Sequence, residues 1–245
     1  MNRLDTELDR LYLAGLLFAQ GDAQDLSLVD ARGRVRALVF EVVRPTGWDA
    51  LSRVWQGVQG ELDLPAPAIA VSGADGLQLW FSLEASIEVA RAHAFLELLR
   101  QRFLAEVPAS RVRLLPDPAE PGRHAPLVPK VQASGDAWSA FVSPDLVAVF
   151  AETPWLDVDP GEEGQAALLR GLGSIKLAAF ESVLARLGAE ARDAGAPAPA
   201  QARGAASAPA SDDPRRFLAR VMNDESAPLA LRVEAAKALL GTRGD

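Results

Sequence analysis

Residues 35–43 read VRALVFEVV, and this stretch decides the fold class. Seven of its nine residues are apolar, which is typical of a central strand buried on both faces. Shorter apolar runs predict further strands, and apolar residues at helical spacing predict the helices between them. The expected strands are 25–29, 68–71, 77–83, 112–115 and 138–142, and the expected helices are 4–16, 48–62, 87–103 and 165–187. This mixture predicts an α+β fold with a mixed β-sheet and flanking helices.

The composition changes near residue 188. Residues 188–211 are rich in alanine, proline and glycine, which predicts a flexible, partly extended linker. It separates a main domain, residues 1–187, from a small C-terminal piece, residues 212–245. Helix-start signals at Ser211 and Ser226 predict a helical hairpin in that piece. Two short helices bury little surface by themselves, so we expect the hairpin to dock on a partner protein or on its own copy in a dimer.

Composition and charge exclude several classes of function. The net charge of −8 argues against general affinity for nucleic acid, which depends on lysine and arginine side chains. The chain contains no cysteine, which excludes disulfides and thiolate chemistry, and its two histidines leave little material for a zinc site. The sequence has no apolar run long enough to span a membrane and no pattern of a signal peptide. We therefore expect a cytoplasmic protein with no membrane partner.

Three segments, taken in order, carry a family resemblance. Residues 38–45 (LVFEVVRP) are similar to a strand that ends in two aspartates one residue apart, and residues 69–80 (IAVSGADGLQLW) to a Ser-Gly hairpin that leads to a histidine. Residues 126–130 (PLVPK) and 138–145 (WSAFVSPD) are similar to a stretch that runs into a third aspartate. These segments resemble the archaeo-eukaryotic primase superfamily, which includes primase-polymerases. The resemblance implies an RRM-related fold and nucleotide transfer by two metal ions.

The chain departs from the pattern of that family at four positions. Glu41 stands where the first aspartate is expected, Val43 at the second, Gln78 at the histidine and Ser143 at the third aspartate. Valine cannot bind a cation, and serine is a poor substitute for a carboxylate. We therefore expect no catalytic residue, metal site or cofactor in this chain.

Some residues of the resemblance could still bind a nucleotide. The Ser-Gly turn is either a phosphate-binding loop or a hairpin turn whose glycines permit positive φ. Arg44 and Lys130, which flank the presumed site, either hold an anionic ligand or are solvated surface charges. Gln78 and Trp80 share a strand face and either contact a base or belong to the core. The nucleotide-binding candidates are Arg44, Ser72, Gly73, Gln78 and Lys130.

The leading functional hypothesis is a non-catalytic, primase-like binding or scaffold protein in DNA replication, repair or mobile-element maintenance. The retained scaffold, the replaced acids and the C-terminal hairpin favour it. One alternative is a nucleotidyltransferase with an altered Mg or Mn site formed by Glu41, Asp75 and Asp145, which requires the three carboxylates to cluster. Another is a nucleotide sensor that binds without turnover.

Overall fold

The computed structural model describes residues 2–13, 27–45, 47–120, 123–133 and 135–195. The predicted hairpin over 212–245, and the linker from residue 196 onward, lie outside the described residues. Met1–Ala196 forms a compact unit. Among the described helices, none combines the length and apolarity that a membrane span requires.

The described residues form one six-stranded sheet with the order β4-β1-β3-β2-β6-β5. Its strands are β1 (Arg34–Val43), β2 (Ala68–Val71), β3 (Gly76–Glu88), β4 (Val112–Leu115), β5 (Lys130–Val131) and β6 (Trp138–Val142). Every neighbouring pair is antiparallel, so the expectation of a mixed sheet was wrong. The reason is that β1 and β2, which run parallel to each other, are separated by β3.

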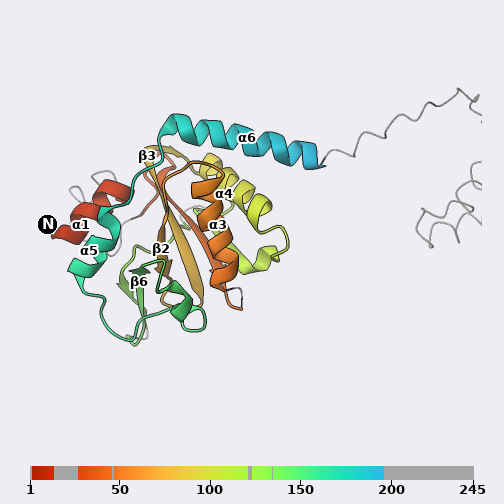
Figure 1. Cartoon of the computed structure of the whole chain (residues 1–245). Helices are drawn as coiled ribbons and strands as arrows, with labels where there is room; N and C mark the ends of the chain where they lie inside the picture. The colour runs from red at the N-terminus through yellow and green to blue at the C-terminus, as the bar shows by residue number, and fades with distance from the viewer. Residues whose placement is uncertain (1, 14–26, 46, 121–122, 134, 196–245) are drawn as a thin grey trace, which may run out of the picture. The chain divides into compact units, whose positions relative to one another are not determined.

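The first four strands and two helices make a split βαβ arrangement. Helix α3 (Trp48–Gly60) connects β1 to β2, and α4 (Val89–Phe103) connects β3 to β4. The resulting element order β-α-β-β-α-β, with the strand order β4-β1-β3-β2, defines this motif. Both helices pack on the same face of the sheet, where α6 (Leu177–Gly195) also packs (Figure 1).

The sheet is buried on both faces, so it separates two apolar cores. The first core lies under α3, α4 and α6 and contains Phe40, Phe81 and Phe95. The second core lies under α1 (Arg3–Leu8), the π-helical turn that follows it, and α5 (Glu162–Arg170). Every residue of 35–43 except Arg36 is at most 5% exposed, which confirms that this stretch is a central strand.

The closing helix predicted over 165–187 is two helices, α5 and α6. Residues 171–173 read GLG, and glycine weakens a helix interior. The chain then meets the sheet, where the Ile175 N–H donates to the Ser82 carbonyl at 2.7 Å and the Glu84 N–H to the Ile175 carbonyl at 2.9 Å. Pairing with an edge of β3 thus replaces helical hydrogen bonds at this point.

Two further expectations differ from the structure. Helix α6 continues to Gly195, so the first residues of the predicted linker are helical, because the alanine, glutamate and arginine side chains there are strong helix formers. In the described part of the strand predicted over 25–29, only Val29 pairs, in a single bridge to Val35. The turn over residues 30–33, with Gly33 at φ +70°, brings these two residues together.

The contact between α3 and α4 generates a stability prediction. A Cβ atom on Gly57 would lie 2.2 Å from Cε1 of Phe103, whereas one on Gly60 meets no atom within 4 Å. We expect Gly57→Ala to lower the free energy of unfolding by about 1–3 kcal/mol through overpacking. The matched change Gly60→Ala should leave stability unchanged or raise it by up to about 1 kcal/mol. Urea denaturation measures both, and equal effects at the two positions would contradict the packing assigned to α3.

Candidate functional site

Three polar side chains lie in a row across neighbouring strands. In the register of the sheet, Glu41 on β1 is opposite Gln78 on β3 and opposite Arg113 on β4. Directly opposed residues of neighbouring strands project to the same face, so all three project to the face of the second core. Glu41 and Gln78 are buried there, whereas the Arg113 side chain is 41% exposed. Two of them, Glu41 and Gln78, are residues that the family resemblance singled out.

The Glu41 carboxylate is buried in this row, since the residue is 4% exposed. Burial raises the pKa of the Glu41 carboxyl above its ordinary value, and the Arg113 charge opposes this shift. One oxygen of the carboxylate lies 3.4 Å from Nη1 of Arg113, and the Gln78 side chain supplies a further hydrogen bond. The buried Glu41 carboxylate therefore has the Arg113 guanidinium on one side and the Gln78 amide on the other.

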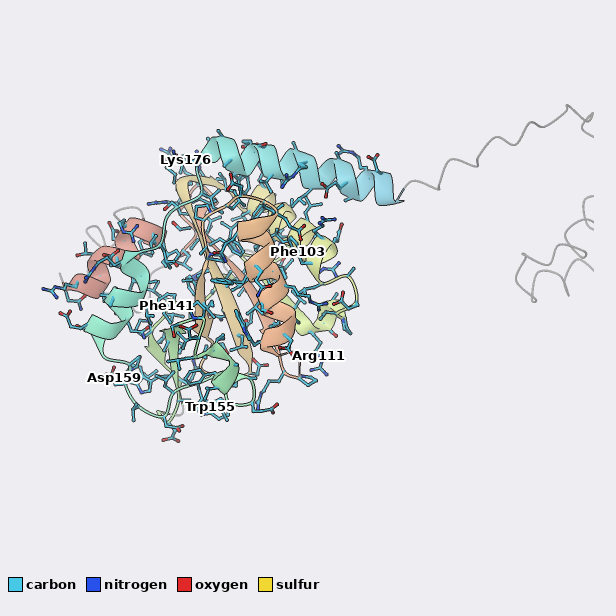
Figure 2. All side chains as sticks on the ribbon, in the orientation of Figure 1. Phe103, Arg111, Phe141, Trp155, Asp159 and Lys176 are labelled. Carbon is cyan, nitrogen blue, oxygen red and sulfur yellow. The ribbon has the colours of Figure 1, made fainter. Side chains whose placement is uncertain are left out.

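Gln78 is held from its other side by the aromatic part of the second core. The Trp80 Nε1–H donates to Oε1 of Gln78 at 2.8 Å. Tyr12 and Phe141 pack against the Trp80 ring at centroid distances of 5.3 and 6.0 Å, and Figure 2 shows Phe141 between β6 and α5. Trp80 is fully buried and Gln78 is 4% exposed, so the pair belongs to the core. In this conformation a ligand at the surface cannot contact the Gln78 amide.

Arg113 also binds Asp75, in the turn between β2 and β3. The guanidinium donates to both carboxylate oxygens, at 2.8 and 2.9 Å, in a bidentate pair. These hydrogen bonds lower the pKa of the Asp75 carboxyl. A single arginine thus binds two of the three carboxylates that the altered metal site would need.

Glycine is required beside Glu41 for steric reasons. A Cβ atom on Gly76 would lie 2.3 Å from Oε1 of Glu41, so only the absence of a side chain there leaves room for the carboxylate. Gly76 is opposite Val43 in the sheet, and Val43 is buried on the same face as Glu41. Val43 stands where the pattern of the resemblance has its second aspartate, and it packs there as a buried apolar residue.

Four backbone amides of the Ser-Gly turn already have partners within the protein. The Ser72 hydroxyl accepts from the N–H groups of Ala74 and Gly76 at 3.2 and 3.0 Å, and the Ser72 N–H donates to the Gly76 carbonyl. The Gly73 N–H donates to the Pro154 carbonyl at 3.0 Å. A phosphate bound here would have to displace these bonds, so the geometry is that of a self-capped hairpin turn with Gly73 at φ +80°.

The two candidate cations lie in different surroundings. The Arg44 guanidinium donates to the Glu152 carbonyl at 2.9 Å and lies 5.6 Å from the centroid of the Trp155 ring, close to the Ser-Gly turn. Lys130 is on β5, where its N–H donates to the Ser139 hydroxyl at 2.8 Å. It lines a cleft of about 240 Å³ that Arg44 does not line.

The remaining family positions do not complete a metal site. Ser143 follows β6, and its carbonyl accepts from the N–H groups of Leu146 and Val147 at 3.1 and 3.2 Å. Asp145 is exposed in the same turn. Within the described ranges, no three histidine or acidic side chains are grouped closely enough to hold a metal ion, so Glu41, Asp75 and Asp145 do not form the predicted cluster.

Sequence reasoning did not single out Arg113, the residue that joins the site together. Its signal is present in the segment 112–115 (VRLL), where one charged residue interrupts an otherwise apolar strand. A charge at that position on a predicted strand indicates either an exposed face or a buried partner.

Neither a protein-family model nor a curated protein matches this chain, so its site is interpreted from geometry and chemistry.

The ion pairs of Arg113 generate a second prediction. Arg113→Met removes the cation beside a buried carboxylate, and we expect the free energy of unfolding at neutral pH to fall by about 2 kcal/mol, between the values typical of exposed and buried pairs. Arg102→Met is the matched control, because Arg102 pairs with Glu61 at the surface. It should change stability by no more than about 0.5 kcal/mol. Chemical denaturation of both variants tests this, and equal losses would show that Arg113 has no special role.

The raised pKa of Glu41 generates a third prediction. The folded protein holds the Glu41 proton more tightly than the unfolded chain, so stability is lost as the pH rises through the interval between the two pKa values. Glu41→Gln removes this titration. The difference in unfolding free energy, wild type minus Glu41→Gln, should therefore fall as the pH rises above about 4, the ordinary range of a glutamate carboxyl. Urea titrations across this range measure it, and a difference that is constant or rises with pH would exclude the assigned shift.

Proposed function

We propose that the chain is a non-catalytic binding or scaffold protein built on a primase-like domain. The observation that carries this proposal is the Glu41–Arg113–Asp75 network. Two-metal nucleotide transfer requires carboxylates that are free to bind cations. Here a guanidinium binds both carboxylates, and the position of the second aspartate is an apolar residue, Val43.

The topology supports the primase-like part of the proposal. The resemblance implies a β-sheet domain with flanking helices, although the mixed sheet that we expected is antiparallel. The chain has this arrangement in β1, α3, β2, β3, α4 and β4. The residues of the family resemblance lie on the central strands β1 and β3, on the sheet face opposite α3 and α4.

The cover over that face supports the non-catalytic part. A nucleotidyltransferase must admit a triphosphate and a primer end to its acidic residues. In this chain the second core, with Tyr12, Trp80 and Phe141, packs over the face that carries Glu41. Gln165 on α5 fixes this cover to β6, since its amide binds both the N–H and the carbonyl of Phe141, at 2.7 and 3.0 Å. Glu41 itself is buried beneath this packing, at 4% exposure.

The setting in DNA replication, repair or mobile-element maintenance is a proposal that depends on the resemblance alone. A scaffold protein in such a setting acts by binding other proteins. We propose protein partners for the C-terminal segment 212–245, because its expected helices have apolar residues and little surface to bury them on.

The proposal predicts that nucleotides and metal ions do not stabilise the protein. A ligand that binds only the folded state raises the melting temperature as its concentration increases. We expect the melting temperature of the full chain to stay unchanged with Mg²⁺ or Mn²⁺, nucleoside triphosphates and single-stranded DNA, added singly and together. We also expect no primer extension by the purified protein with either metal.

Two other outcomes would replace the proposal with a different function. A saturable rise with nucleoside triphosphate that Lys130→Ala abolishes would identify a nucleotide sensor. Primer extension that Glu41→Gln abolishes, with folding intact by circular dichroism, would identify a nucleotidyltransferase with an altered site. Arg3→Ala, a change at an exposed cation outside the candidate site, is the control for both measurements.

A further inference from the structure

A short 3₁₀-helix, Val147–Phe150, follows β6 in the chain, and its two sides have different surroundings. Side chains three residues apart share a side of such a helix. Val147 is fully buried in the first core, and Phe150 packs against that core. Leu146 and Val149, the apolar pair, lie on the other side and are 57% and 72% exposed. The Val149 N–H donates to the Leu146 carbonyl at 3.0 Å, which fixes the spacing of the pair.

Exposed apolar side chains are concentrated in this part of the chain. Among the described residues, the large apolar side chains that are exposed are Leu146, Val149, Val158 and Leu177, and three of these four lie within residues 145–158. A single exposed apolar residue is ordinary. Two that are adjacent on one side of a helix favour a binding surface.

The chain that follows the apolar pair is fixed to the sheet. The Gly73 N–H donates to the Pro154 carbonyl at 3.0 Å, and Trp138 and Leu156 exchange two backbone hydrogen bonds, at 2.8 and 3.1 Å. Figure 2 shows Trp155 at the margin of the domain, on the side away from α6. A surface that is already held in place loses little conformational entropy when a partner binds.

The charge around the apolar pair is negative. Residues 145–158 contain three acidic residues and no lysine or arginine. Two of the acids, Asp145 and Glu152, flank the pair, and within the described part of the chain neither carboxylate forms an ion pair. Arg44 contacts this segment through the Glu152 carbonyl and the Trp155 ring. Three negative charges and the Arg44 charge leave a net charge of −2.

This charge discriminates between the possible partners. The acidic side chains repel the phosphate groups of nucleic acids and of anionic membranes. A second copy of the chain, related by a two-fold axis, would bring the same carboxylates together. A protein segment with lysine or arginine beside apolar side chains complements both the charge and the apolar pair.

The spacing of the apolar pair indicates a helical partner segment. Three residues of a 3₁₀-helix rise about 6 Å along its axis. Apolar residues at positions i and i+4 of an α-helix are separated by about the same rise and lie on one face. Basic residues in the neighbouring turns of such a helix would then lie near Asp145 and Glu152.

We propose that the apolar pair and its two flanking carboxylates bind a basic amphipathic helix of a partner protein. This inference rests on the proposed binding function and names a surface and a partner class for it. Burial of the apolar pair supplies affinity, and the carboxylates supply the preference for basic segments.

The test uses the isotope-labelled full chain and a helical peptide with leucine at positions i and i+4 and lysine in the neighbouring turns. The same peptide with glutamate in place of lysine is the control ligand. We expect the lysine peptide to shift the amide NMR signals of residues 145–152 saturably, and the glutamate peptide to bind more weakly. Val149→Ser should weaken the lysine peptide by about fivefold. Leu177→Ser, the same kind of change at an exposed apolar residue of α6, should have no effect.

A second pair of variants tests the carboxylates. Glu152→Gln should weaken the lysine peptide by about threefold and reduce the salt dependence of binding. Glu84→Gln, a change at an exposed glutamate of β3, should alter neither the affinity nor its salt dependence.

Several results would overturn the inference. They are the absence of binding, equal binding of the two peptides, and equal effects of Val149→Ser and Leu177→Ser. Self-association in sedimentation velocity that Val149→Ser abolishes would also overturn it, because a second copy would then occupy this surface. These failures leave melting temperatures with nucleotides and primer extension unaffected, so they are distinguishable from a failure of the proposed function.

Discussion

A carboxylate buried within the central strand sets the constraint on which this structure depends. Glu41 lies in a sheet covered on both faces, where an ionised group without partners costs several kcal/mol. Three features around it offset this cost. Arg113 lies opposite it on β4, Gln78 lies opposite it on β3, and Gly76 leaves the space that its oxygen occupies.

The same arrangement accounts for the closed character of the candidate site. The hydrogen bonds of Gln78 and Trp80 are shielded from water by Tyr12 and Phe141, and in such surroundings polar contacts are stronger than at the surface. The cover that strengthens these contacts also separates Glu41 and Gln78 from solvent, while Arg113 and Asp75 are partly exposed. A site of this kind can stabilise and orient a scaffold, whereas chemistry on a large, charged substrate would require the cover to move.

The sequence predicted the strands more accurately than the connections. The strands at 68–71, 112–115 and 138–142 were predicted with their observed bounds, because short apolar runs between turn signals are local features. The helix predicted over 165–187 failed because pairing of Ile175 with β3 is a long-range event that apolar spacing does not reveal. For the site, the resemblance identified Glu41 and Gln78 but not Arg113, since the motifs do not include β4.

The sequence by itself determined that the chain is an α+β protein with a buried central strand, because side-chain periodicity and apolar content are local properties of the chain. Only the tertiary structure decided what the polar residues on those strands do. Arg113 is 72 residues from Glu41 and 38 from Asp75 in the sequence, and their contact depends on the register of β4 against β1 and on the turn before β3. Register is set by the packing of both sheet faces together, so no single segment encodes it.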